Sequence, residues 1–339
     1  MSDPSERLAM PAGAPLGPGV LELDVAAEVE RICAWMVQEV SSTLHRRGVV
    51  VAMSGGVDSS VCAALAVRAL GPRKVYGLLL PERDSKNASS DLGREVAEHL
   101  GLSYELFNIS PTLEAIGCYR LRDDAIRAVF PDYADDWKCK VAIAGGATGG
   151  INFFKMIVES PDGQRQEARL PIREYLQVVA ATSFKQRIRK TLEYYHADRL
   201  NYAVIGTPNR LEYDQGFFVK NGDGAADLKP IAHLFKTQVY ALARYLELPE
   251  DVCAALPTTD TYSLVQGQDE FYFALPYDQM DIALWAHNHG RSEIELAAAL
   301  SITEEHARII FADIEAKRRT THYQHARPLL VEAVSEIVS

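Results

Sequence analysis

Short apolar runs and longer stretches of helical periodicity alternate along this chain. Apolar residues between Val25 and Leu44 recur at helical spacing and predict a long amphipathic helix. Apolar runs predict strands at 49–53, about 74–80, about 103–108 and 202–205. Helical patterns between them predict helices at 61–70, 90–100, 113–129 and 182–196. Strands that alternate with helices are typical of a parallel sheet with both faces covered, so we predict a doubly wound α/β fold.

Three parts of the chain depart from this alternation. Residues 1–20, rich in Pro, Gly and Ala, are predicted to be a mobile N-terminal arm, and residues 21–339 a single domain. Residues 140–177 are predicted to be an insertion that contains a hairpin of Phe153–Glu159 and Glu167–Leu170. Its glycine-rich stretch, 144–150, suits either a second phosphate loop or a flexible linker, and we favour the linker. Residues 257–339 are predicted to be an irregular loop followed by helices at 277–289, 294–300 and 303–319.

The first predicted strand ends in a glycine-rich turn that suits a phosphate. Residues 54–59 read Ser-Gly-Gly-Val-Asp-Ser, and a helix follows at once. A helix N-terminus presents unpaired N–H groups and the positive end of the helix dipole. The glycines lack a Cβ where the backbone must approach an anion, and the serines add hydroxyl donors. Asp58 is unexpected beside phosphate unless a cation lies between them, so we predict that it binds Mg²⁺.

A second polar stretch lies farther along the chain, at residues 206–238. Thr207 follows a predicted strand, which places it beside the first loop if the two strands are neighbours. Glu212 is close enough in sequence to reach the same metal ion. Lys236 stands at a predicted helix start, where the helix dipole disfavours a cation, so we expect it to face phosphate. Taken singly, Asp223 suits a turn and Lys236 suits a solvated surface equally well.

Together these motifs resemble those of the NAD synthetases, which are N-type ATP pyrophosphatases. The resemblance covers about residues 25–325. It rests on the Ser-Gly-Gly-x-Asp-Ser loop, on Gly-Phe-Phe-x-Lys-x-Gly-Asp-Gly-x-x-Asp at 216–227 and on Pro-Thr-x-Asp at 257–260. Lys-x-Arg-x-Arg at 185–189 and Lys-Arg at 317–318 look like two further family motifs. The resemblance implies a Rossmann-like sheet of the adenine nucleotide alpha hydrolase type.

The resemblance also implies a reaction, in which ATP drives the amidation of deamido-NAD by ammonia to give NAD, AMP and pyrophosphate. The nicotinate carboxylate attacks the α-phosphorus of ATP, and ammonia then displaces AMP from the acyl-adenylate. The residues implied to bind ATP are Ser54, Gly55, Gly56, Val57, Asp58, Ser59, Thr207, Lys236 and Thr258. Those implied to bind deamido-NAD are Arg187, Lys220, Asp223 and Asp227. Asp58 and Glu212 would hold Mg²⁺, Lys236 would stabilise developing charge, and Asp223 would hold or deprotonate ammonium.

Two positions depart from the family pattern. Ser183 stands where the family usually has Asn, and Ala316 where it often has His before the C-terminal Lys-Arg. Both changes affect the dinucleotide side, so an enzyme that amidates a different carboxylate stays an alternative. A nucleotide-binding regulatory protein is disfavoured, because Asp58, Glu212 and Lys236 are retained together.

The resemblance further implies a homodimer, which the apolar excess of the first helix and of the 182–196 helix favours. The stretch before Val49 is too short for an amidase domain, so we expect the nitrogen to arrive as free ammonia or from a separate glutaminase.

Composition excludes several classes of protein. The net charge is −11 and the chain has no Lys- or Arg-rich run, which argues against a broad nucleic-acid surface and against a tRNA thiolase. No apolar stretch approaches the length of a membrane span. The five cysteines are scattered and form no C-x-x-C pair, which indicates a reducing compartment, so we expect a cytoplasmic protein.

Overall fold

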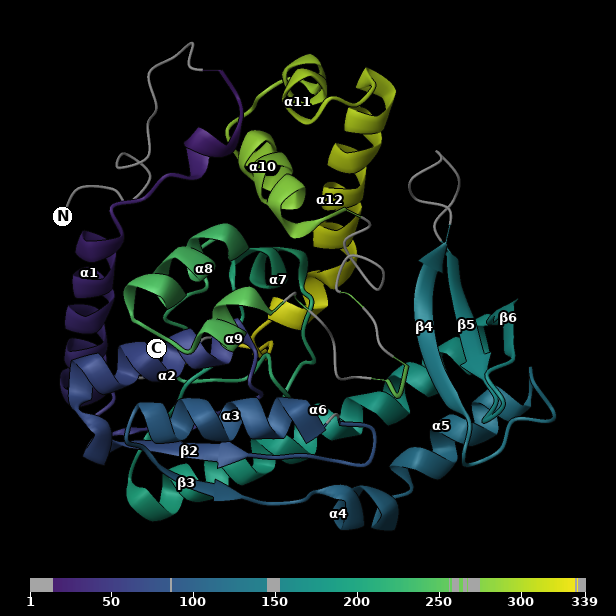
Figure 1. The fold of residues 1–339 in the computed structure, drawn as a ribbon, viewed down its shortest axis with the longest axis horizontal. Coiled ribbons are helices and arrows are strands. Elements are labelled where there is room, and N and C mark those ends of the chain that lie inside the picture. The colour runs from purple at the N-terminus through teal and green to yellow at the C-terminus, as the bar shows by residue number, and fades with distance from the viewer. Residues whose placement is uncertain are drawn as a thin grey trace.

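A four-stranded parallel sheet lies at the centre of the computed structural model, in the order β3-β2-β1-β7 (Figure 1). The structure describes residues 15–85, 87–144, 153–255, 257, 262–264, 267, 275–332 and 334. The strands are β1 (Val49–Ala52), β2 (Val75–Leu79), β3 (Ser103–Leu106) and β7 (Ala203–Val204). β1 pairs with β2 through Val49↔Val75 and with β7 through Val49↔Ala203. All four lie where the sequence predicts strands, and the predicted parallel α/β fold is confirmed.

Helices cover both faces of this sheet because its buried residues alternate between two cores. Val49 and Val51 point to one face, whereas Val50 points to the other. The first face packs against α1 (Val25–Gln38), α2 (Val57–Leu70), α3 (Asn87–His99) and α8 (Lys236–Tyr245). The second packs against α4 (Ser110–Ala115), α5 (Cys118–Arg127) and α6 (Ile172–Leu200). β1 is thus a central strand and β7 is the edge strand beside it, and the loops after them lie at the same carboxyl end of the sheet.

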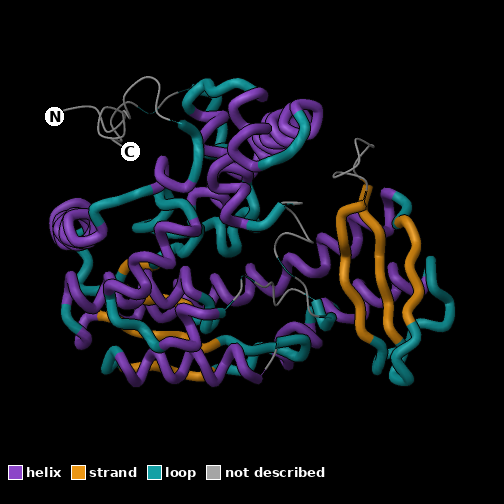
Figure 2. Tube along the Cα trace, turned by 45° about the horizontal axis from the view of Figure 1, so that its top comes forward, coloured by secondary structure: helices purple, strands orange, loops and turns teal. Residues whose placement is uncertain are grey.

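A second, antiparallel sheet packs beside α5 and α6, away from the parallel sheet (Figures 1 and 2). Its order is β4-β5-β6, and its strands are β4 (Lys138–Ala144), β5 (Phe153–Glu159) and β6 (Arg165–Arg169). The predicted hairpin corresponds to β5 and β6. β4 was not predicted, although its Cys139 and Val141 are buried against Met156 and Val158 of β5.

The predicted insertion at 140–177 therefore needs new bounds. The added sheet begins at Lys138, and residues 172–177 belong to α6, which is far longer than the predicted helix at 182–196. The glycine-rich stretch lies outside the described residues from 145 onward.

The last helices form a unit above α7 and α8 (Figure 1). It comprises α10 (Tyr277–Asn288), α11 (Glu293–Leu300) and α12 (Glu304–His325), while α7 (Arg210–Gln215) and α9 (Glu250–Ala254) are short connecting helices. Its core includes Val20 and Leu21, which belong to the short helical turn Pro18–Leu21. Val20, the last residue of the predicted mobile arm, is thus part of the packed structure, because its apolar side chain is buried, while residues 1–14 lie outside the described residues.

None of the helices in the described part of the chain combines the length and the apolar character that a membrane span requires.

Candidate nucleotide site

The turn after β1 is held in shape by its own serine hydroxyls. Ser59 Oγ lies 3.1 Å from Ser54 Oγ and donates to the Gly56 carbonyl at 3.0 Å. Gly55 has a φ of +78°, and a Cβ added there would lie 2.4 Å from the carbonyl oxygen of Ser89 in α3. Gly56 is the N-cap of α2 and supplies no side-chain cap, so the N–H groups of the first helical turn face the loop uncapped. This geometry suits an anion, as the sequence predicted.

Thr207 lies at the same edge of the sheet as this loop. β7 is hydrogen-bonded to β1 in parallel, so the carboxyl ends of both strands point the same way. The predicted condition that the two strands are neighbours is therefore met.

A buried ion pair joins the loop to a distant helix. Asp58 lies in the first turn of α2, and Lys236 is the first residue of α8. The Lys236 ammonium contacts Asp58 Oδ2 directly, with only 3% of the Lys236 side chain and 16% of the Asp58 side chain exposed. Asn209, the N-cap of α7, donates from Nδ2 to Asp58 Oδ1 at 3.2 Å. The two oxygens of Asp58 thus contact two different elements.

The electrostatics of this cluster keep Lys236 charged. Burial lowers the pKa of the Lys236 ammonium, but the charges of Asp58 and Glu212 and the hydrogen bond that the ammonium donates to Asp58 outweigh it, so the net pKa lies above its usual value. Burial is the main cause that raises the pKa of the Cys62 thiol, and the charges of the same two carboxylates raise it further. Asp58 and Glu212 therefore act on a common region next to the phosphate loop.

The donor set of this region fits Mg²⁺. Two carboxylates offer the hard oxygen ligands that Mg²⁺ prefers. Among the described residues no group of three or more acidic, His or Cys side chains could hold a metal. Mg²⁺ usually keeps several waters and is bound by one or two carboxylates plus substrate phosphates, so a pair such as Asp58 and Glu212 is sufficient.

A second set of predicted residues lies around the 216–227 loop. The Lys220 ammonium donates to the carbonyls of Tyr323 at 2.9 Å and Ala326 at 2.8 Å, and it lies 4.1 Å from the centre of the Tyr323 ring. Arg187 donates from Nε to the Lys220 carbonyl at 3.3 Å. Lys220 in this structure therefore hydrogen-bonds to carbonyls at the C-terminal end of α12, a contact that the sequence did not predict.

Both acidic residues of this loop accept hydrogen bonds from the backbone. Asp223 accepts from the Val219 N–H at 2.7 Å, and burial raises the pKa of its carboxyl despite this bond and the charge of Lys190. Asp227 accepts from the Val204 N–H at 2.7 Å and from the Tyr194 hydroxyl at 3.2 Å. Asp227 thus ties the loop to β7.

The remaining predicted positions are Thr258 and the C-terminal Lys-Arg pair. Thr258 lies outside the described residues. Lys317 is paired with Asp313 at 2.6 Å, and Arg318 with Asp214 at 2.7 Å, so the predicted C-terminal Lys-Arg pair forms ion pairs within the chain.

Sequence reasoning missed two residues beside the predicted ones. Asn209 contacts Asp58, and the Asn-x-x-Glu pattern that it forms with Glu212 is a capping-box signature that could have found it. His325 packs its ring against those of Tyr213 and Phe218. No sequence signal distinguished this histidine from its neighbours.

A buried charge network holds the turn that follows β2. Lys185, from the predicted Lys-x-Arg-x-Arg motif, donates to Glu82 at 3.0 Å and to Asp84 at 2.7 Å. Arg122 of α5 pairs with Asp84 at 2.5 Å, and the Tyr119 hydroxyl donates to Glu82 at 2.9 Å. The first residue of that motif therefore positions a loop.

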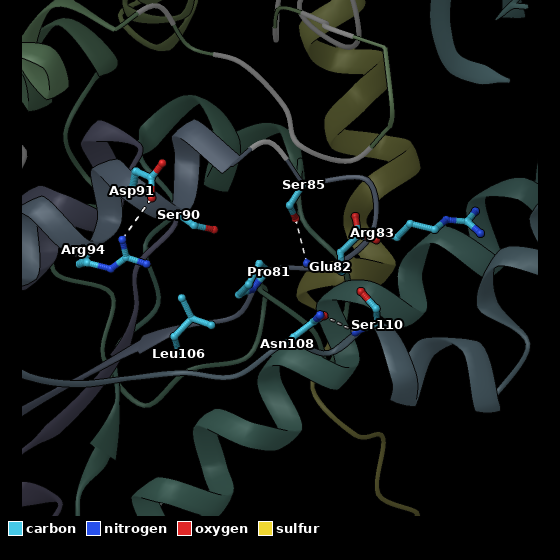
Figure 3. Close-up of a pocket in the computed structure, with 10 residues that line it drawn as sticks. All are labelled: Pro81, Glu82, Arg83, Ser85, Ser90, Asp91, Arg94, Leu106, Asn108 and Ser110. Carbon is cyan, nitrogen blue, oxygen red and sulfur yellow. Dashed lines mark hydrogen bonds and ion pairs between the residues drawn. The ribbon is translucent and has the colours of Figure 1, made fainter. Parts of the chain in front are cut away.

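A polar cavity of about 450 Å³ opens beside this turn, at the carboxyl ends of β2 and β3 (Figure 3). It is lined by Glu82, Arg94, Asn108 and Ser110, among others. None of the predicted site residues lines it, so it is separate from the Asp58 cluster.

The structure is that of an α/β protein in which a glycine-rich loop and a buried Asp58–Lys236 pair lie at the carboxyl end of a parallel sheet, an arrangement that suits a nucleotide. The family model described as NAD synthase matches residues 28–129 and 150–325. An NH(3)-dependent NAD(+) synthetase of Mesorhizobium japonicum is 54% identical over 94% of this chain and 100% of its own length. One from Thermotoga maritima is 37% identical over 72% of this chain and 82% of its own. The chain belongs to the NAD synthase family, which confirms the predicted resemblance.

Solved structures agree in fold. The NH3-dependent NAD synthetase of Campylobacter jejuni covers 91% of this chain and 100% of its own at 22% identity, with a TM-score of 0.60. The NMN synthetase of Francisella tularensis covers 91% and 99% at 21% identity, with a TM-score of 0.62. At these identities the likeness concerns the fold alone, and the fold alone does not choose between the two products.

Proposed function

We propose that this protein is an ammonia-dependent NAD⁺ synthetase, which converts deamido-NAD, ATP and ammonia into NAD, AMP and pyrophosphate. The observation that carries the proposal is the convergence of Asp58, Glu212 and Lys236 beside an uncapped helix N-terminus. This arrangement suits an ATP that is attacked at its α-phosphorus. The relatives named above carry the same activity in their names.

The chemistry requires positive charge where two anions meet. The nicotinate carboxylate forms a bond to the α-phosphorus, and the bond to the pyrophosphate oxygen breaks. The loop from Ser54 to Ser59 holds the departing pyrophosphate through N–H and hydroxyl groups. Lys236 stabilises the negative charge that develops at the phosphate, and Asp58 with Glu212 holds Mg²⁺, which supplies Lewis-acid charge when bound.

The second half-reaction forms the amide. Ammonia attacks the carbonyl carbon of the acyl-adenylate, and AMP leaves with the electrons of the broken C–O bond. The ammonium ion must lose one proton before attack and a second afterwards. We assign a proton-accepting or ammonium-holding role to Asp223, whose raised pKa in a buried loop suits this role.

Deamido-NAD is placed at the 216–227 loop, together with Arg187, Lys220 and Asp227. Lys220 donates to carbonyls at the end of α12, and Asp227 accepts from the Val204 N–H of β7. Both must therefore act on the dinucleotide through the loop that they stabilise, or Lys220 must exchange its α12 carbonyls for the ligand. Replacing Lys220 with Met separates these roles. A rise in KM for deamido-NAD at unchanged thermal stability supports direct contact, whereas loss of stability supports the structural role.

The proposed substrate is tested by incubating the protein with ATP, ammonium and deamido-NAD. NAD and AMP should form in equal amounts. AMP without NAD would instead favour the related enzyme that amidates another carboxylate.

We further propose a homodimer. Ile172, Leu176 and Val179 form a stripe on α6 at helical spacing, and they are 71%, 56% and 37% exposed. Exposed apolar side chains that share one helix face are typical of a contact surface. Sedimentation velocity at micromolar protein should show a dimer that a Leu176→Glu substitution weakens, and a fully active monomer would contradict the proposal.

The five cysteines are all free and buried, which is consistent with a reducing compartment, and we place the protein in the cytoplasm.

A further inference from the structure

The first turn of α8 is capped from another helix. The N-cap residue, Phe235, has no side-chain atom that could accept a hydrogen bond. Asp281 of α10 accepts instead from the Lys236 N–H at 3.3 Å and from the Thr237 N–H at 2.8 Å. Its Oδ2 also accepts from the Thr237 hydroxyl at 2.8 Å. One carboxylate thus satisfies three donors of two adjacent residues.

This carboxylate is fully buried among apolar neighbours of the C-terminal unit. Asp281 has no exposed surface, and the residues on either side, Met280 and Ile282, belong to the C-terminal core. Burying a carboxylate is unfavourable unless it is well hydrogen-bonded. A Ser or Asp at the N-cap itself would stabilise α8 equally well. A cap supplied by α10 adds something different, because it fixes the first turn of α8 relative to a second helix.

The residue that this cap fixes is Lys236. Its ammonium contacts Asp58 in the structure, and in the proposed reaction it must turn toward a phosphate. When the ammonium leaves Asp58, the ion pair no longer restrains α8. The hydrogen bonds that Asp281 accepts come from backbone N–H groups, so they persist through that exchange.

We propose that Asp281 is a positioning residue for Lys236, which it holds through the backbone at the N-terminus of α8. This inference rests on the proposed function, in which Lys236 acts on ATP. Asp281 does not touch the nucleotide; it keeps the Lys236 side chain within reach of the phosphate.

The test compares Asp281→Asn with Thr237→Val and with a matched control. Asn keeps one acceptor oxygen but presents an NH₂ group to a backbone N–H, so the first turn of α8 should shift. We expect kcat/KM for ATP to fall about 10- to 100-fold, and KM for deamido-NAD to change less than 2-fold. Thr237→Val leaves both backbone bonds in place and should lower kcat/KM for ATP less than 5-fold.

Ser292→Ala provides the control for a lost cap. Ser292 caps α11 in the same C-terminal unit, where its hydroxyl accepts from the Glu295 N–H at 3.3 Å. We expect this variant to lose stability while its kcat/KM for ATP stays within 2-fold of the wild type. An equal loss of activity in Ser292→Ala would show that any weakening of the C-terminal unit has the same effect, and would overturn the proposal.

A double-mutant cycle with Lys236→Met separates positioning from general stabilisation. If Asp281 acts through Lys236, adding Asp281→Asn to Lys236→Met should lower the residual kcat/KM by less than 2-fold. A further 10-fold loss in that background would overturn the proposal.

The ATP affinity of the same four proteins of the cycle is measured in parallel by calorimetry. If the wild type makes no NAD, the proposed function fails, while the coupling between positions 281 and 236 still appears in ATP binding. If the wild type makes NAD and Asp281→Asn keeps full activity and affinity, only the positioning role fails.

Discussion

The two adjacent glycines of the phosphate loop should respond very differently to alanine. The sequence assigns them one common role, close approach of the backbone to an anion. The structure separates them. Gly55 has a φ of +78°, and its added Cβ would lie 2.4 Å from the Ser89 carbonyl oxygen and 3.1 Å from the Gly93 nitrogen. Gly56 has an extended backbone with φ −77°, and among the described residues its added Cβ would meet only Ser54 Oγ, at 3.4 Å.

The magnitudes follow from these contacts. A non-glycine residue in the left-handed region costs about 1–2 kcal/mol. Displacing the start of α3 to relieve a backbone clash adds about 1–3 kcal/mol, as overpacking generally does. Gly55→Ala should therefore lower the free energy of unfolding by about 2–5 kcal/mol. Gly56→Ala only replaces a tolerated N-cap with a poor one, which costs about 0.5–1 kcal/mol.

Urea denaturation of both variants without ligand measures the difference. Activity then gives the second half of the comparison. Gly56→Ala should lose only about 0.5–1 kcal/mol of stability. It should nevertheless lose at least about 10-fold in kcat/KM for ATP, because the new methyl group lies where a phosphate approaches the helix N-terminus. Equal stabilities for the two variants, within about 0.5 kcal/mol, would refute the reasoning about the loop.

Three further predictions concern Asp58, Asp281 and the nitrogen source. Asp58→Asn should lower turnover at least about 100-fold. It should also lower the free energy of unfolding by up to about 3–5 kcal/mol, because the Lys236 ammonium stays buried without its partner. Urea denaturation and steady-state kinetics check this, and near-normal rates at saturating Mg²⁺ would contradict it. Burial raises the pKa of Asp281 to about 7, so the folded state holds a proton that the unfolded chain releases near pH 4. The stability that this group contributes is therefore present below about pH 4 and lost as pH rises through about 7, by at most about 1.4 kcal/mol per pH unit. Relative to Asp281→Asn, the wild type should become less stable between pH 5 and 7.5. Parallel curves of unfolding free energy against pH for the two proteins would contradict this. Ammonium should support the reaction and glutamine should not, and at fixed total ammonium the rate should rise from neutral to alkaline pH because ammonia is the nucleophile; a glutamine-driven rate equal to the ammonium-driven rate in the purified protein would overturn this.

The parallel sheet was predictable because its signals are local. Each strand is a short apolar run, and the phosphate loop joins β1 to α2 within a few residues. The pairing of Asp58 with Lys236 was partly predictable, since a lysine at a helix start already pointed to an anion. In the structure this anion is Asp58 itself. The contact depends on how α8 packs against α2, and no local sequence pattern encodes that packing.

The features that the sequence analysis did not predict depend on contacts between residues far apart in the chain, or lie in segments without a clear apolar pattern. β4 carries alternating lysines and apolar residues, but its partner β5 follows the glycine-rich stretch, so the pairing was not evident. The sequence analysis missed the first part of α6 because Ile172 and Leu176 are exposed, so the apolar residues there give no clear core-facing pattern. The cap from Asp281 connects residues that are 44 positions apart in sequence. The contact of Lys220 with the end of α12 likewise depends on tertiary packing.

In the proposed function, the Asp58 cluster activates a carboxylate of deamido-NAD for amidation by ammonia. The most direct test follows AMP and NAD together in one reaction of purified protein with ATP, Mg²⁺, ammonium and deamido-NAD. We expect equimolar NAD and AMP in the wild type, and at least about a 100-fold loss of both in Asp58→Asn. AMP release without NAD, or full NAD formation by Asp58→Asn, would contradict it.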